Sequence, residues 1–138
     1  MANIKGITIK IDGDTKSLQT ALKDVEKSLK TTESELKQVN RALKFDPSNQ
    51  SLMKQKQELL NHSIKETEEK LKAMKTAQSQ ATDEMRKNNP EEFRKLEREI
   101  SKTANKLKGL KTQQSSVNFQ MSKMGLYSAR LKKAGSVR

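Results

Sequence analysis

Few residues in this chain have the type and spacing that catalysis or metal binding requires. His62 is the only histidine, and we predict a surface or half-buried residue rather than a metal ligand or a general base. Cysteine is absent, which excludes a thiolate metal site, a cysteine nucleophile and a disulfide framework. The five glycines form no phosphate-binding loop. We therefore expect no catalytic residue, no metal and no cofactor, and we predict that the protein is not an enzyme.

Carboxylates occur in adjacent pairs, an arrangement that could support acid–base chemistry, but each pair lies among lysines. Lysines three or four residues away on a helix form ion pairs with such carboxylates at the surface. We interpret the pairs as ion-pairing helix faces: Glu68-Glu69, Asp83-Glu84 and Glu91-Glu92.

Positive charge is concentrated toward the C-terminus. Of the 29 Lys and Arg, nine follow Ser101, whereas none of the 17 Asp and Glu does, and the formal net charge is +12. This imbalance favours an anionic partner such as nucleic acid, an acidic protein surface or a phospholipid headgroup layer, although a solvated basic helix face has the same pattern. The candidate contacts are Lys102, Lys106, Lys108, Lys111, Lys123, Arg130, Lys132 and Lys133.

Most of the chain after residue 14 follows a heptad repeat, with apolar residues alternately three and four positions apart. Three such stretches predict three long helices at about residues 15–44, 47–88 and 90–133, packed as antiparallel helical hairpins or as a coiled-coil bundle. The predicted seam consists of Leu18, Leu22, Val25, Leu29, Leu36, Val39, Leu43, Leu60, Ile64, Leu71, Met74, Met85, Leu96, Ile100, Leu107, Leu110 and Val117.

Polar residues interrupt this seam at intervals. They fix the register of the helices but give up apolar burial, which predicts a bundle of modest stability. The polar seam residues are Thr32, Gln57, Thr67, Gln78, Thr103 and Gln114.

Three apolar or aromatic residues, Phe119, Leu126 and Tyr127, lie outside the third seam, among the C-terminal lysines. Aromatic rings among cations could stack on nucleic-acid bases or anchor a protein contact. We favour a protein contact over the alternative, a helix edge covered by a neighbouring helix.

Composition limits the fold to one elongated, mainly α-helical domain. With 33% charged, 31% hydrophobic and 3% aromatic residues, the chain can bury a narrow apolar stripe but not a broad core. No apolar run approaches the roughly 20 residues that span a bilayer, and the N-terminus lacks the apolar segment of a signal peptide. We expect a protein made in a cytosol, without a membrane span.

A short β-strand precedes the helices and, with its turn, forms a separate N-terminal element over residues 1–14, followed by the helical domain over residues 15–138. Ile7, Ile9 and Ile11 alternate with polar residues, as in a strand, and no second strand is evident. A lone strand leaves its backbone hydrogen bonds unmade, so we expect it to pair with another chain. Removal of residues 1–11 should then leave helicity nearly intact.

Two prolines mark the turns between the helices, near residues 45–49 and 88–90. In each, the polar residue before the proline is the predicted N-cap and the proline the first helical residue: Asp46 with Pro47, and Asn89 with Pro90. A tight hairpin centred at Pro90 places Met74 opposite Leu107, and Leu71 opposite Leu110.

Two blocks of the sequence resemble a known family. Residues 4–15 (IKGITIKIDGDT), and residues 40–49 (NRALKFDPSN) followed by 54–60 (KQKQELL), are similar to the N-terminal region of tape measure proteins from long-tailed phages and prophages of Gram-positive bacteria. The resemblance covers about the first 70 residues, and later residues match only in character.

The resemblance implies a non-enzymatic structural protein that acts in tail assembly. Tube subunits polymerise on such proteins, whose full length sets the tail length. It implies self-association, as a trimer or hexamer, and contacts with other tail proteins, in the host cytoplasm during assembly and then in the virion tail. A helix of 138 residues spans only about 200 Å. We therefore expect the chain to be an N-terminal fragment or a truncated form of such a protein. How the full-length protein determines the tail length cannot be read from these residues.

Two other functional classes fit the same pattern. A small basic coiled coil could bind nucleic acid through residues 102–138, with an affinity that falls steeply with salt. A helical-hairpin substrate of a Gram-positive secretion system also fits the fold class, but the chain contains no tryptophan for the Trp-x-Gly turn that is usual in that family.

Overall fold

A computed structural model describes residues 5–136 of the chain, and the side chains of residues 5–125. The protein is mainly α-helical, with a small antiparallel sheet at its N-terminal end. The elements, in order, are β1 (Thr8–Ile11), β2 (Asp14–Ser17), α1 (Leu18–Phe45), α2 (Gln50–Gln80), α3 (Asp83–Asn88) and α4 (Pro90–Ser136).

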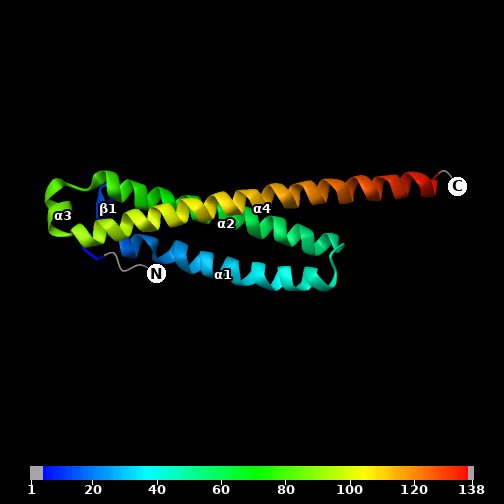
Figure 1. Cartoon of the computed structure of the whole chain (residues 1–138), viewed down its shortest axis with the longest axis horizontal. Helices are drawn as coiled ribbons and strands as arrows, with labels where there is room; N and C mark the ends of the chain where they lie inside the picture. The colour runs from blue at the N-terminus through cyan, green and yellow to red at the C-terminus, as the bar shows by residue number, and fades with distance from the viewer. Residues whose placement is uncertain (1–4, 137–138) are drawn as a thin grey trace.

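The three long helices form an elongated antiparallel bundle (Figure 1). α2 runs back along α1, and α4 runs back along α2, so α2 is the central helix that packs against both others. α4 is the longest helix, with 47 residues, and continues past the turn between α1 and α2 to Ser136. The hairpin of β1 and β2 packs at the opposite end of the bundle, beside the turn that contains α3.

The prediction of a lone strand that pairs with another chain was wrong. β1 pairs with β2 inside the chain, with Ile11 opposite Asp14. The intervening Asp12 and Gly13 have φ angles of 52° and 86°, as a two-residue type I′ turn requires at both positions. β2 escaped prediction because its sequence, DTKS, is polar throughout and every residue in it is exposed.

The predicted strand-pairing residues instead contribute to the core of the same chain. Ile7 and Ile9 are buried, with 0% and 2% of their surface exposed, whereas Ile11 is 41% exposed. Gln80 at the end of α2 also binds the backbone of β1. Its Oε1 accepts from the Lys10 N–H at 2.7 Å, and its Nε2 donates to the Lys10 carbonyl at 3.0 Å. The hairpin therefore belongs to the bundle and is not a separate domain over residues 1–14.

α1 begins at Leu18 rather than at residue 15, because residues 14–17 form β2. Ser17 caps the helix, since its hydroxyl accepts a hydrogen bond from the Thr20 N–H at 3.1 Å. Several polar residues before Leu18 could cap a helix. Because residues 14–17 pair in the sheet, the helix begins after Ser17, which is therefore the cap.

The turn between α1 and α2 lies where it was predicted, but its caps differ. Asp46 is the C-cap of α1, and its N–H donates to the Ala42 carbonyl at 3.1 Å. α2 begins at Gln50, three residues after Pro47, and its N-cap is Asn49, whose side chain accepts from the Leu52 N–H at 2.9 Å. Assigning Asp46 as the N-cap was wrong, because α2 begins after Asn49, whose side chain binds one of the free amides of the first turn.

The second turn is longer than predicted. α2 ends at Gln80 instead of residue 88, and the short helix α3 follows, capped by Thr82, whose hydroxyl accepts from the Met85 N–H at 3.1 Å. Asn89 is the C-cap of α3, and its carbonyl accepts from the Phe93 N–H at 3.1 Å. Pro90 is the first residue of α4, as predicted.

The core consists of two apolar clusters at different levels of the bundle. The first joins the β-hairpin to α1, α2 and α4. The second lies toward the turn between α1 and α2. The predicted register around Pro90 was wrong, because Leu71 and Met74 pack in the first cluster whereas Leu107 and Leu110 pack in the second. The insertion of α3 moves the turn away from Pro90 and shifts α4 along α2.

All predicted seam residues are at least partly buried, while the coiled-coil interpretation itself stays a prediction. The buried ones are Leu18, Leu22, Leu29, Leu36, Val39, Leu43, Leu60, Ile64, Met74, Leu96, Leu110 and Val117. The half-buried ones are Val25, Leu71, Met85, Ile100 and Leu107.

Candidate interaction surfaces

A layer of charged and hydroxyl-bearing residues separates the two apolar clusters. Lys70 of α2 lies at its centre, with its Nζ 3.2 Å from Glu99 Oε1 on α4 and 3.9 Å from Glu26 Oε1 on α1. All three side chains are less than a fifth exposed. One ammonium group of α2 thus lies between a carboxylate of α1 and a carboxylate of α4 at this level.

Glu26 is the residue of this group whose charged form is disfavoured by burial. Burial raises the pKa of its carboxyl group, the Lys70 ammonium opposes the rise, and the nearby Glu99 carboxylate adds to it. Its Oε1 is buried and accepts no hydrogen bond. The shorter contact to Glu99 leaves Glu26 the less well compensated of the two carboxylates.

A second buried carboxylate, Glu66, lies one turn along α2. It is 5% exposed, and its Oε1 lies 2.9 Å from the Thr32 hydroxyl of α1 and 3.5 Å from His62 Nε2. The Thr32 hydroxyl also lies 3.0 Å from the Ser28 carbonyl, but its single proton is better used by the charged oxygen. His62 itself is largely exposed, with 58% of its side-chain surface accessible.

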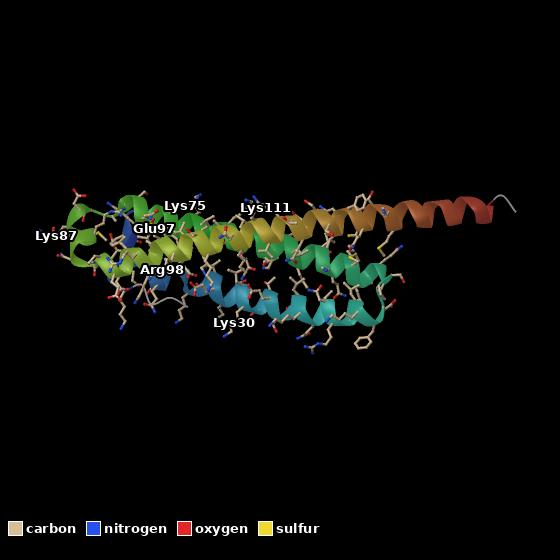
Figure 2. All side chains as sticks on the ribbon, in the orientation of Figure 1. Lys30, Lys75, Lys87, Glu97, Arg98 and Lys111 are labelled. Carbon is tan, nitrogen blue, oxygen red and sulfur yellow. The ribbon has the colours of Figure 1, made fainter. Side chains whose placement is uncertain are left out.

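Two of the lysines predicted to contact an anionic partner are used within the chain. Lys106 forms an ion pair with Glu33 of α1, and Lys111 lies 3.9 Å from Glu68 of α2. Lys102 and Lys108 are exposed on α4. Figure 2 shows Lys111 among charged side chains that project from the outer faces of all three long helices. The side chains of the other predicted contacts, Arg130, Lys132 and Lys133, lie outside those described.

The bundle ends in an apolar groove next to the uncovered part of α4. Met121, Met124 and Gly125 of α4 line it together with Gln50 and Met53 of α2, and its volume is about 210 Å³. We call these five residues the methionine groove. An added Cβ on Gly125 would meet no atom within 4 Å, so the groove is open above this residue.

Exposed aromatic residues lie at the same end of the molecule. Phe45 at the end of α1 is 87% exposed, and Phe119 of α4 is 61% exposed, with Lys123 Nζ 4.8 Å from its ring centroid. Leu126 and Tyr127, the other two residues of the predicted protein contact, have side chains outside those described.

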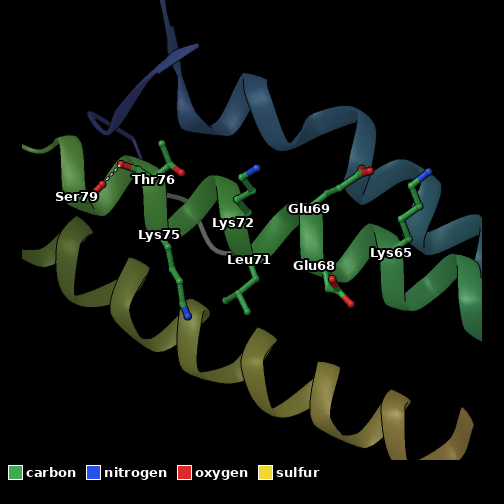
Figure 3. Close-up of a pocket in the computed structure, with 8 residues that line it drawn as sticks. All are labelled: Lys65, Glu68, Glu69, Leu71, Lys72, Lys75, Thr76 and Ser79. Carbon is green, nitrogen blue, oxygen red and sulfur yellow. Dashed lines mark hydrogen bonds between the residues drawn. The ribbon is translucent and has the colours of Figure 1, made fainter. Parts of the chain in front are cut away.

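A larger open groove of about 710 Å³ lies along α2 (Figure 3). Lys65, Lys72 and Lys75 line it together with Glu68 and Glu69, so cations and anions alternate over a shallow surface. Its hydrogen bond from the Ser79 hydroxyl to the Thr76 carbonyl, at 2.9 Å, is internal to the helix. We assign no ligand to it.

Among the residues that the structure describes, no group of three or more His, Cys, Asp or Glu could hold a metal ion. No helix in the described part of the chain combines the length and the apolar character needed to cross a membrane. The chain matches no protein-family model, no curated protein and no solved structure.

Sequence reasoning missed the polar layer. It identified Thr32 and Thr67 as polar seam positions, but it did not identify Lys70 or Glu66, which lie beside the seam. Glu66 follows His62 by one helical turn, and this spacing was the available signal. Lys70 could not be recognised, since it is one of many lysines and only the packing of three helices brings two carboxylates to it.

Proposed function

We propose that this chain is a structural module of a phage or prophage tail, the N-terminal helical part of a tape measure protein. It would act by docking and self-association during tail assembly, whereas length determination belongs to the full-length protein. The proposal includes a location in the host cytoplasm during assembly and then in the tail.

The observation that supports it is the position of the two sequence blocks in the fold. The described part of the first block, residues 5–15, leads into and begins the β-hairpin, and residues 40–49 include the end of α1 and its turn to α2, whereas residues 54–60 lie within α2. The first two segments lie at the two ends of α1, where turn chemistry and capping decide how the chain folds back. Two of the three similar segments thus lie at corners of a folded unit, where shared lysine and glutamine content alone would not place them.

The experiment is to induce the source prophage, purify its virions, and search separated tails for peptides of residues 1–138 by mass spectrometry. We expect these peptides in intact tails before DNA ejection. Deletion of the coding region for residues 15–80 should abolish tails or make them aberrant. Normal tails from that deletion, or tails without these peptides, would refute the proposal.

A nucleic-acid-binding coiled coil is the second candidate, and the exposed Lys102 and Lys108 favour it. Lys106 and Lys111 argue against it, because both already face carboxylates of the chain. The test is the salt dependence of duplex DNA binding, where the logarithmic slope is near 0.9 for each phosphate neutralised. A slope of at least about four, lowered by about one in Lys102→Glu, would support it, whereas a flat dependence would exclude it.

A further inference from the structure

The last part of α4 has an uncovered face that continues the packing surface of the bundle. Val117 is 2% exposed, and Met121 and Met124 pack partly against the second apolar cluster. In the sequence, the same spacing of three and four residues continues to Ser128 and Leu131. α1 and α2 turn back before this level, while α4 continues as a helix (Figure 1).

Where α4 packs along the bundle, the neighbouring helices α1 and α2 supply carboxylates to its lysines. There, Lys106 lies against Glu33 of α1, and Lys111 lies against Glu68 of α2. The uncovered part of α4 also contains lysine and arginine residues. It contains no carboxylate of its own to pair with them, because no Asp or Glu follows Ser101. The sequence places Lys123, Arg130, Lys132 and Lys133 in this part, so a helix that covers it must bring its own carboxylates.

The methionine groove offers the apolar contact where such a helix would begin. Three methionine side chains border it, and methionine adapts its shape to different partners. Gly125 leaves space above the helix backbone, which allows a large side chain of the partner to approach closely. Phe45 and Phe119 add exposed aromatic surface at the same end.

We propose that an acidic amphipathic helix of a partner protein docks in the methionine groove and runs along the uncovered part of α4. Its apolar residues fill the groove, and its carboxylates pair with the cations of α4. A second copy of this chain fits less well, because two chains that each carry a formal net charge of +12 repel one another. The inference does not depend on a role in phage tails.

The test uses the whole chain and a labelled peptide of four heptads with leucine at the two seam positions and glutamate beside them, followed by fluorescence anisotropy. The decisive variant is Gly125→Leu, and Gly109→Leu is its control. At both glycines an added Cβ meets no atom within 4 Å, so both variants should fold as the parent does, which circular dichroism checks. We expect Gly125→Leu to weaken binding at least about tenfold because it fills the groove, and Gly109→Leu to leave it unchanged.

The electrostatic part is tested with Lys123→Glu against Lys108→Glu, which carry the same charge change on the same helix. We expect Lys123→Glu to weaken binding more, by about fivefold, since Lys123 precedes the groove residues Met124 and Gly125 in the sequence, whereas Lys108 lies in the covered part. Glycine variants that weaken binding equally would overturn the proposal, as would a peptide with serine in place of leucine that binds equally well. Self-association of the chain that Gly125→Leu abolishes would show a second copy in the groove and would also overturn it, and so would duplex DNA bound there instead.

Discussion

At the scale of single residues, the free-energy cost of burying charge in the polar layer falls on Glu26. Its pKa is raised in the folded state, so the folded protein holds a proton on this carboxyl group at a pH where the unfolded chain has released it. This proton makes its full contribution to stability at a pH below the pKa that Glu26 has in the unfolded chain. The contribution is lost as the pH rises through the pKa that Glu26 has in the folded protein. At neutral pH, therefore, the ionised Glu26 contributes less stability than its protonated form would.

Replacing Glu26 by glutamine should remove this cost. We expect Glu26→Gln to raise Tm at pH 7 by about 2 °C, and the gain should shrink as the pH falls below the raised pKa of Glu26. Lys70 keeps its closer partner, Glu99, in the variant. Glu35→Gln, at an exposed position of the same helix, is the control and should change Tm little. A lower Tm for Glu26→Gln at pH 7 would show that the pair with Lys70 outweighs burial.

The Thr32 hydroxyl should stabilise the fold through Glu66. Thr32→Val keeps the shape of the side chain but removes the only hydrogen-bond donor from another helix that Glu66 has in the structure's described part. We expect a loss of about 1–3 kcal/mol in the free energy of unfolding, measured by urea denaturation. Thr31→Val is the matched control, because Thr31 is exposed and bonds only the Lys27 carbonyl of its own helix. Equal losses in the two variants would show that the contact to Glu66 contributes nothing.

At the scale of elements, the β-hairpin completes the first apolar cluster, and its removal should unfold more than the hairpin. We expect Ile9→Ala to lower the free energy of unfolding by about 2–5 kcal/mol, because Ile9 is 2% exposed. Ile11→Ala should change it by less than about 0.5 kcal/mol, because Ile11 is exposed at the hairpin turn. Thermal unfolding followed at 222 nm measures both. If Ile9→Ala behaves like Ile11→Ala, the hairpin is a separate module, as first expected from the sequence.

The helices and their approximate ends could be predicted because each depends on local chemistry. Apolar periodicity determines which residues are buried, and Pro90 starts α4 because proline suits the first turn of a helix. The break after Gln80 could not be predicted in this way. It contains neither proline nor glycine, and Thr82 is one of many residues able to cap a helix.

Pairing across the chain was harder to predict. The turn residues Asp12 and Gly13 signalled a hairpin, but the polar sequence of β2 concealed the second strand. The candidate surface was partly predictable, since the excess of lysine after Ser101 is visible in the sequence. The carboxylates that neutralise Lys106 and Lys111 come from α1 and α2, and only the register of the bundle shows which lysines they meet.

At the scale of the whole molecule, net charge should govern self-association. Copies of a chain with a formal charge of +12 repel one another, and screening of that repulsion grows as the Debye length falls from about 10 Å at 0.1 M salt to about 3 Å at 1 M. The strand that first suggested pairing between chains is satisfied by β2, so assembly must use exposed surface such as Phe119. We expect sedimentation equilibrium to show single chains at low salt and a trimer or hexamer at high salt and high protein concentration. A mass that stays at one chain under all these conditions would contradict the expected self-association. Phe119→Ser should lower the high-salt mass, and so should Phe45→Ser, because both changes remove exposed aromatic surface from the same end of the molecule.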